Sequence, residues 1–229
     1  MVLDHSISLI HKDSLGDSLN VVDLSHNKLG NYVNTGIFTN KSFYVLSLEN
    51  NSIEILEKDA FAGMTLLDAL SIASNPISEL PPYVLEDLSD LDYLLASDCE
   101  LTHISTHLFE SSPSLKILDL SKNKLHTFNV NTVKKLKEMS KLFIDGNPFE
   151  CDCQLYPLWH WSKENDISLI NDDSGEGPTC KEREWEEFEN ITCSRRDTAD
   201  PLDKTATFIG TATNVAQMIA LFSLFAIVT

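Results

Sequence analysis

The chain has 229 residues, of which 17 are basic and 35 are acidic, so its formal net charge is −18. Binding to phosphate groups requires a positive face, and this charge therefore argues against a nucleic-acid partner. We interpret the acidic excess as a solvated surface, with a designed contact for a basic partner as the alternative.

The first residues lack the pattern of a secretory signal peptide. The segment from Met1 to His5 has no basic start, and Asp4 interrupts any apolar run. Apolar residues further on fit the core positions of an irregular repeat, namely Ile7, Ile10, Leu15 and Leu19.

One pattern then occurs six times, each copy 24 residues after the last. It runs Leu-x-x-Leu-x-Leu-x-x-Asn-x-Leu, and Leu115 to Leu125 is its clearest copy. The ninth position is occupied by Asn27, Asn51, Asn75, Cys99, Asn123 and Asn147. Five equal gaps are not expected from composition alone, so the repeat determines the architecture.

Each position of the pattern predicts a place in the fold. The fourth and sixth residues alternate with period two, which puts both on one face of a strand. Apolar residues on the return leg, such as Leu56, Phe61 and Met64, close the coil around the same core. One repeat cannot bury this surface alone, so neighbouring repeats must stack. The ninth-position amides are predicted to form a ladder that satisfies backbone groups at the inward turn.

The pattern resembles the leucine-rich repeat. That resemblance implies an α/β solenoid curved like a horseshoe, with parallel strands on the concave face and loops, turns and short helices on the convex face. It also implies a module that binds rather than catalyses. We assign residues 1–146 to the repeats. Cys99 fits the pattern as a small buried residue with a weak S–H donor, and a reactive thiol is the alternative interpretation.

A cysteine-rich segment, residues 147–194, follows the last repeat. It opens Asn147-Pro-Phe-Glu-Cys151-Asp-Cys153 and ends with Cys180 and Cys193. Between them, Leu155, Leu158 and Trp161 recur at three-residue steps, which predicts a helix whose apolar face covers the last repeat. The segment resembles the cysteine-flanked C-terminal cap of extracellular leucine-rich-repeat proteins.

The cap cysteines indicate the redox compartment. Four cysteines allow three pairings, and the sequence alone does not choose among them. The family resemblance implies Cys151–Cys180 and Cys153–Cys193. A four-cysteine zinc site is the disfavoured alternative, because one pair is Cys-x-Cys and the other is separated by twelve residues. Disulfides persist in oxidising compartments, so we expect an extracellular protein.

Three glycosylation sequons agree with an extracellular location; they begin at Asn40, Asn50 and Asn190. Asn50 is next to the ladder, where a glycan would be crowded, so Asn40 and Asn190 are preferred. Because a disulfide-bonded domain has to be secreted, the missing signal peptide leads us to expect that the chain is part of a longer precursor. The alternative is an unconventional, uncapped first repeat.

A short stalk, residues 195–214, precedes a hydrophobic tail at residues 215–229. The 25 residues after Lys204 carry no charge, and no basic residue follows the apolar run. A GPI-attachment signal fits this pattern best, with attachment near Asp203 and Asp197 as the second choice. A single transmembrane helix is the alternative, although it usually has a basic cytoplasmic flank. A buried structural helix is the third interpretation.

Catalytic and metal-binding patterns are absent from the sequence. His103 and His107 are four residues apart but lack the glutamate of a zinc-protease helix, and packing explains His160 between two tryptophans. No Gly-rich phosphate loop, Gly-x-Ser-x-Gly elbow or EF-hand spacing is present. We therefore expect no enzyme activity, no catalytic residue, no metal site and no cofactor.

The third, fifth and seventh positions of each repeat should point away from the core, onto the concave sheet. Large apolar residues occupy these positions in the later repeats, and we predict a contiguous exposed patch formed by Tyr93, Leu95, Ile117 and Phe143. Asp119 is a weaker candidate, because Leu-Asp-Leu-Ser is common in the repeat itself. The alternative is that strand-forming residues fill a strand and bind nothing.

Together these features predict a protein-binding module at the extracellular face of the plasma membrane, held there by its C-terminal tail. The family resemblance implies an adhesion molecule or a receptor ectodomain that recognises a protein ligand on its concave face. The alternatives are a secreted matrix or inhibitor protein, and the ligand-binding part of a signalling or innate-immune receptor whose other portions are missing. The sequence names no ligand and leaves homo-oligomerisation open.

Overall fold

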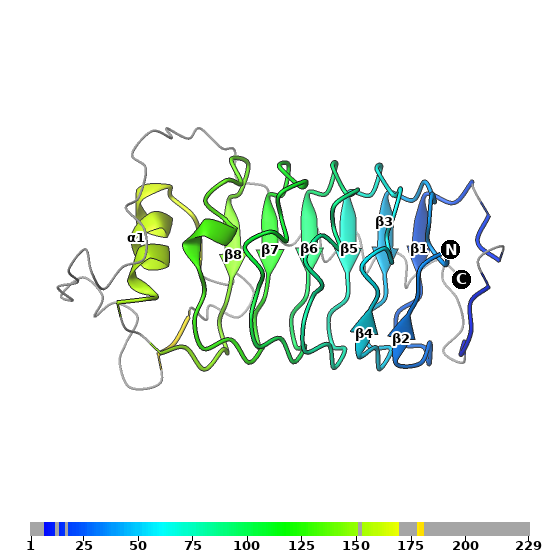
Figure 1. The fold of residues 1–229 in the computed structure, drawn as a ribbon, viewed down its shortest axis with the longest axis horizontal. Helices are drawn as coiled ribbons and strands as arrows, with labels where there is room; N and C mark the ends of the chain where they lie inside the picture. Colours follow the sequence, from blue (N-terminus) through cyan, green and yellow to red (C-terminus); the bar gives the residue numbers. More distant parts are fainter. Residues whose placement is uncertain (1–6, 12–13, 17, 151–152, 170–177, 181–229) are drawn as a thin grey trace.

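The structure is a computed structural model, and it describes residues 7–11, 14–16, 18–150, 153–169 and 178–180. Each repeat contributes one three-residue strand to a six-stranded parallel sheet, and the coils lie side by side along the long axis (Figure 1). The strands follow one another in chain order: β1 (Val21–Asp23), β3 (Val45–Ser47), β5 (Ala69–Ser71), β6 (Tyr93–Leu95), β7 (Ile117–Asp119) and β8 (Lys141–Phe143).

The 24-residue period sets the strand register. The fourth-position leucine of each copy pairs with that of the next, as Leu94 does with Leu118 and Leu118 with Leu142. These leucines point into one continuous apolar core, which extends through the described residues from Ile10 to Leu169. The predicted leucine-rich-repeat solenoid with parallel strands is confirmed.

The return legs contain little regular structure. Two short strands, β2 (Tyr32–Val33) and β4 (Ile55–Leu56), pair in parallel, and one 3-10 helix, η1, covers Val130–Thr132. Val33 and Leu56 are buried, whereas Tyr32 and Ile55 face outward with exposed fractions of 42% and 52%. The β2–β4 pair was not predicted, because two-residue strands are too short to show a hydrophobic period.

The asparagine ladder forms as predicted. Asn75 is 1% exposed; its Nδ2 donates to Leu48 O and Ile72 O, each at 2.9 Å, and to Ala73 O at 3.1 Å. Its Oδ1 accepts from the backbone N–H groups of Asn51 and Ile53, both at 2.9 Å. Each amide therefore joins its own coil to the preceding one.

Cys99 occupies one ladder position and makes only weaker, longer hydrogen bonds there. Its Sγ lies 3.5 Å from both Ile72 O and Ser97 O, and the residue is 6% exposed. Burial raises the pKa of the thiol to about 11. The thiol is free and protonated at neutral pH, which supports the interpretation of Cys99 as a small buried residue rather than a reactive one.

An irregular coil precedes β1, as the spacing of its apolar residues predicts. Ile10 and Leu15 are buried, and Ile7 and Leu19 pack against the same core. Ile7 N–H donates to Asn27 Oδ1 at 2.9 Å, which continues the ladder backward. The first coil is thus part of the solenoid.

Helix α1 (Tyr156–Glu164) lies beyond β8 at the other end of the solenoid (Figure 1). The three residues predicted to form its apolar side, Leu155, Leu158 and Trp161, are all buried in the main core. Pro157 falls in the first turn, where its missing N–H breaks no helical hydrogen bond. The chain then returns to β8, where Leu142 N–H donates to Ser168 O at 2.9 Å and so continues the sheet.

Two cysteines of this region are described, Cys153 and Cys180, and each is disulfide-bonded. Cys151 and Cys193 lie outside the described residues, so the pairing and the boundaries of the cap remain predictions. The stalk, the hydrophobic tail, Asn190, Asp197 and Asp203 also lie outside them. Of the helices that are described, none has both the length and the apolar character needed to cross a membrane.

Candidate protein-binding surface on the concave sheet

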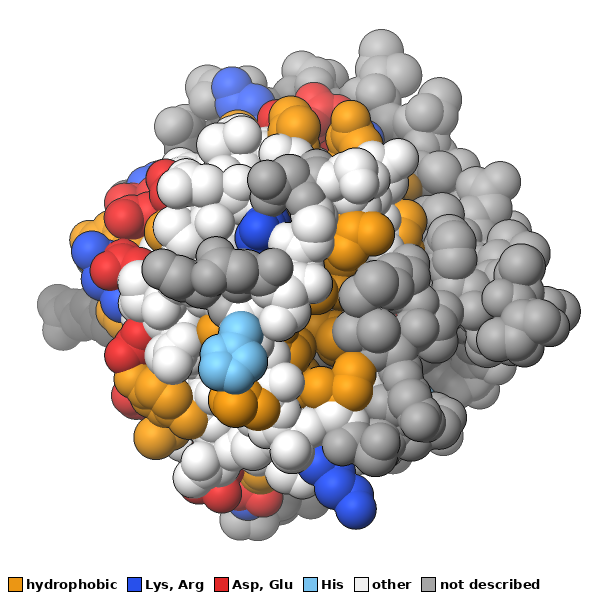
Figure 2. All heavy atoms as spheres, turned by 90° about the vertical axis from the view of Figure 1, so that its right-hand side faces the viewer, with side chains coloured by type: hydrophobic (Ala, Val, Ile, Leu, Met, Phe, Trp, Pro, Cys, Tyr) orange, Lys and Arg blue, Asp and Glu red, His pale blue; other side chains and the backbone are white. Residues whose placement is uncertain are grey.

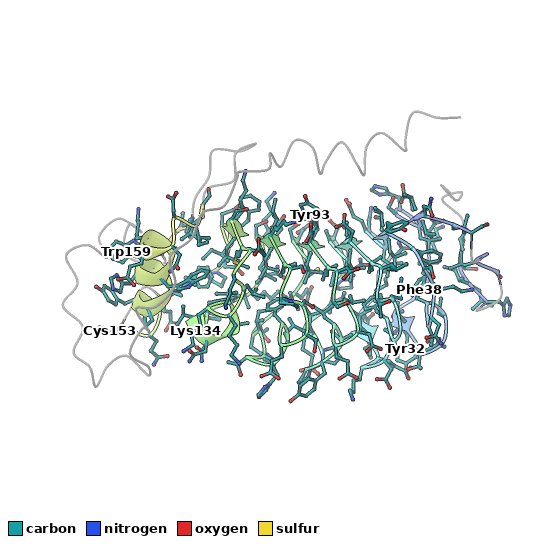
Figure 3. The ribbon with its side chains drawn as sticks, turned by 90° about the horizontal axis from the view of Figure 1, so that it is seen from above. Tyr32, Phe38, Tyr93, Lys134, Cys153 and Trp159 are labelled. Atoms are coloured by element: carbon teal, nitrogen blue, oxygen red, sulfur yellow. The ribbon has the colours of Figure 1, made fainter. Side chains whose placement is uncertain are left out.

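The strand positions that point away from the main core form a second apolar cluster. Ile117 and Phe143 are its buried members, and Tyr93 and Leu95 pack against them. We call these four residues the concave patch. Tyr93 pairs with Ile117 in the strand register, while Asp119 lies between Leu95 and Phe143. Figure 3 shows Tyr93 on the opposite side of the solenoid from Tyr32 on the return leg.

The exposure of the concave patch differs from the prediction. Ile117 is 1% exposed and Phe143 is 2% exposed, whereas Tyr93 and Leu95 are partly exposed. The prediction that all four side chains are exposed was therefore wrong for Ile117 and Phe143. Strands in a sheet are only about 4.8 Å apart, so large neighbours on both sides shield a side chain. Ile117 lies between Tyr93 and Lys141 in the register, and the segment at Ser168 continues the sheet beyond β8.

Asp119 is engaged in a local turn. Its Oδ1 accepts hydrogen bonds from Ser121 N at 2.9 Å and from Ser121 Oγ at 2.7 Å. Asp23 and Ser25 form the same arrangement in the first repeat, with the Ser25 N–H donating to Asp23 at 2.9 Å. Because this turn recurs in another repeat, Asp119 remains a weaker candidate for ligand binding than the apolar residues beside it.

A row of charged side chains borders the concave patch at the second pattern position. Burial raises the pKa of Asp68, and the neighbouring carboxyl of Asp92 raises it further. The Lys116 ammonium donates to Asp92, and this hydrogen bond raises the pKa of Lys116. Burial also raises the pKa of the Tyr93 phenol, with Asp92 and Asp68 adding to the rise. Sequence reasoning missed this row, although its residues share one pattern position.

One polar group on the same sheet has no partner. The Oγ of Ser71 is buried, with the residue 1% exposed, and no described residue hydrogen-bonds to it. Ser71 is aligned with Leu95 in the strand register. A buried hydroxyl without a partner lowers stability, and Ser71 is too deeply buried to contact a ligand directly.

The other residues considered as candidate sites are not part of the concave patch. Asn40 and Asn50 are both exposed, and Asn50 Nδ2 lies 2.8 Å from His26 Nδ1. Glycosylation of either remains a prediction.

His107 Nδ1 lies 3.0 Å from Glu110 Oε1, and His160 stacks on Tyr156. Among the described residues, no three or more His, Cys, Asp or Glu side chains gather to form a metal site.

Comparison with known proteins agrees with the fold described above. The leucine rich repeat family matches residues 41–101 and 97–149. The chain therefore contains leucine-rich repeats, and its fold is a leucine-rich-repeat solenoid. The crystal structure of the TLR13–ssRNA13 complex superposes with a TM-score of 0.55 at 27% identity, covering 58% of this chain and 19% of that one.

Two curated relatives are similar to part of this chain. Trophoblast glycoprotein of Macaca fascicularis is 27% identical over 66% of this chain and 41% of its own length. Toll-like receptor 5 of Homo sapiens is 31% identical over 48% of this chain and 12% of its own length. The chain thus spans less than half of either relative. The first of these relatives is named as a glycoprotein and the second as a receptor.

Proposed function

We propose that this chain recognises a protein ligand on its concave sheet, as part of an adhesion molecule or receptor at the extracellular face of the plasma membrane. The observation that carries the proposal is the second apolar cluster on the sheet face opposite the core. Side chains on that face are not needed to close the coils, and partly exposed aromatic and aliphatic groups there are typical of interaction sites.

The chemistry of the surface restricts the ligand. Tyr93 and Leu95 supply apolar contact area, and Asp68 and Asp92 supply acidic character at its border. A protein surface with an aliphatic or aromatic residue beside a basic one complements this arrangement. RNA is bound by the structural neighbour described above, but a net charge of −18 disfavours the same ligand here.

Attachment to the membrane is the second part of the proposal. The uncharged run after Lys204 supports a GPI signal with attachment near Asp203, and a single transmembrane helix is the alternative. The proposed cap with Cys151–Cys180 and Cys153–Cys193 would close the solenoid next to this anchor. Relatives that are receptors support the alternative in which the chain is the ligand-binding part of a signalling receptor.

The test is a binding screen that uses the chain as bait against an array of purified human and mouse cell-surface ectodomains. Changing Tyr93→Ala and Leu95→Ala together should weaken every specific interaction at least tenfold, which corresponds to about 1.4 kcal/mol or more. Tyr83→Ala is the matched control, because Tyr83 is 38% exposed, stacks on His107 and is not part of the concave patch or its charged border.

The control variant should bind like the unchanged chain. Both variants should remain folded with cooperative unfolding, because the replaced side chains lie outside the main core, and only the double variant should unfold at a somewhat lower midpoint, because Tyr93 and Leu95 pack against Ile117 and Phe143. Unchanged binding by the Tyr93 and Leu95 double variant would refute the concave site. Phe143→Ala does not serve this purpose, since Phe143 is 2% exposed and its loss should also lower stability.

A further inference from the structure

The side chains at the second pattern position form a row along one edge of the concave sheet. Four successive coils contribute Tyr44, Asp68, Asp92 and Lys116. Backbone hydrogen bonds join this row from coil to coil: Asp68 N–H donates to Tyr44 O at 2.8 Å, and Asp92 N–H donates to Asp68 O at 2.9 Å. Lys116 N–H donates in turn to Asp92 O at 2.8 Å. Successive members therefore lie one strand spacing apart, which is about 4.8 Å.

The two carboxylates of the row have different partners. Lys116 Nζ donates to Asp92 and forms an ion pair with it. No lysine, arginine or histidine among the described residues forms an ion pair with Asp68. Burial raises the pKa of Asp68 and the charge of Asp92 raises it further, so the ionised form of Asp68 is incompletely compensated. One lysine thus serves two carboxylates, and Asp68 is the one left without a direct cation.

Asp68 differs from the carboxylates that water solvates. Glu100 and Lys124 form an ion pair of 2.8 Å, and their side chains are 49% and 56% exposed. Figure 2 shows acidic and basic side chains interspersed along the left edge of the molecule. Water stabilises charges of that kind, whereas Asp68 is partly shielded from it. A cation brought by a partner would therefore interact more strongly with Asp68 than with a fully exposed carboxylate.

Exposed apolar side chains lie beside Asp68. Tyr44, its neighbour in the row, is 48% exposed, and Leu66, two residues before Asp68, is 40% exposed. Tyr93 lies near the row from the side of the concave patch, because Asp92 and Asp68 add to the effect of burial in raising the pKa of its phenol. A carboxylate between two tyrosines can bind a guanidinium through two hydrogen bonds, while a tyrosine ring stacks on the guanidinium plane.

We propose that the protein ligand of the concave sheet places an arginine side chain against Asp68, between Tyr44 and Tyr93. This inference rests on the proposed function and identifies a group that the ligand must carry. A guanidinium suits the site better than the ammonium of lysine, because its planar fork binds a carboxylate and stacks on a ring at once. Leu66 would contact the aliphatic stem of the arginine. The net charge of −18 also favours the approach of a basic surface.

The probe is a phage-displayed library of random linear peptides, selected on the immobilised full chain in a non-ionic detergent. Peptides that do not bind the double variant Tyr93→Ala, Leu95→Ala occupy the concave sheet, and these should be enriched in arginine. For a synthetic peptide of this group, Asp68→Asn should raise the dissociation constant about tenfold. Changing the peptide's arginine to alanine should weaken binding to the unchanged chain by a similar factor, but should not weaken binding to Asp68→Asn further. Changing that arginine to lysine should also weaken binding, by about threefold or more.

Asp59→Asn is the matched control, since it removes the same charge from an exposed aspartate on the return leg after β4. It should leave peptide binding unchanged. Asp68→Asn should unfold at an equal or higher urea midpoint at pH 7, so that unfolding does not explain its loss of binding.

Concave-sheet peptides without arginine, or equal binding by the unchanged chain and Asp68→Asn, would overturn the proposal but leave the concave site in place. An equal loss with Asp59→Asn would assign the effect to net charge and overturn it as well. Selection of no peptide that depends on Tyr93 and Leu95 would also overturn it, while the screen of ectodomains decides separately whether the concave site exists.

Discussion

The ladder amide of Asn75 offers a direct measure of what joins one coil to the next. Replacing Asn75 with alanine removes three donated and two accepted hydrogen bonds at a site that is 1% exposed. Water cannot replace the lost amide without opening the coil. The backbone N–H groups of Asn51 and Ile53 would then be buried without partners.

Each unsatisfied buried N–H costs about 1–3 kcal/mol, so we expect Asn75→Ala to lower the free energy of unfolding by about 3–5 kcal/mol. That is a large part of the 5–15 kcal/mol typical of a domain. The measurement is urea unfolding followed by circular dichroism, with the slope m unchanged and the midpoint lowered.

Cys99 supplies the internal comparison, because it holds an equivalent ladder position with only two contacts of 3.5 Å. Cys99→Ala should cost about 1 kcal/mol, mainly through lost apolar burial. Asn34→Ala, at an exposed asparagine, should change stability by less than about 0.5 kcal/mol. If Asn75→Ala were no more harmful than Cys99→Ala, the ladder hydrogen bonds would not be what stabilises the stacking of coils.

Three further predictions concern the cap, the tail and the acidic row. Non-reducing peptide mapping should link Cys151 to Cys180 and Cys153 to Cys193 with Cys99 reduced, and loss of either bond should cost about 2–5 kcal/mol; any link to Cys99 would contradict the pairing. If the tail is a GPI signal, surface protein should be released by phosphatidylinositol-specific phospholipase and contain no peptide beyond about Asp203, whereas an intact Thr229 terminus would indicate a transmembrane helix. Burial and Asp92 raise the pKa of Asp68 in the folded state, so its ionisation destabilises the fold as pH rises through that value. Asp68→Asn should therefore raise the urea midpoint at pH 7, and the gain should shrink as the pH falls through the raised pKa and be lost once the pH is below about 4; a gain that did not depend on pH would exclude this cause.

The period of the sequence was sufficient to predict the sheet, its register and the ladder. Because the copies are equally spaced, each fourth-position residue aligns with its counterpart in the next coil. Leu94, for example, pairs with Leu118 and is fully buried. The cap helix was predictable for a similar reason, because Leu155, Leu158 and Trp161 recur on one side of a helix. Regular spacing thus specifies both the coils and the helix that covers the last of them.

Features that depend on neighbouring side chains could not be predicted in this way. Strand alternation placed Phe143 correctly on the face opposite the core but gave no information on what lies beside it. The continuation of the sheet at Ser168 comes from a segment with no repeat pattern. The ladder contact of the first coil, from Ile7 to Asn27, spans 20 residues where that from Leu101 to Asn123 spans 22, and the repeat pattern does not show this difference.

The same division between core and concave positions determines which residues are free to serve recognition. The leucines and ladder amides cannot change without loss of stability, since they are buried and shared between coils. Substitution of Ile117 or Phe143 should lower stability in the same way, because almost no surface of either side chain is accessible. A ligand on the concave sheet must therefore contact Tyr93 and Leu95 first, with the row at Asp68 beside them. This places the proposed contact on β5 and β6, nearer the middle of the sheet than the sequence pattern indicated.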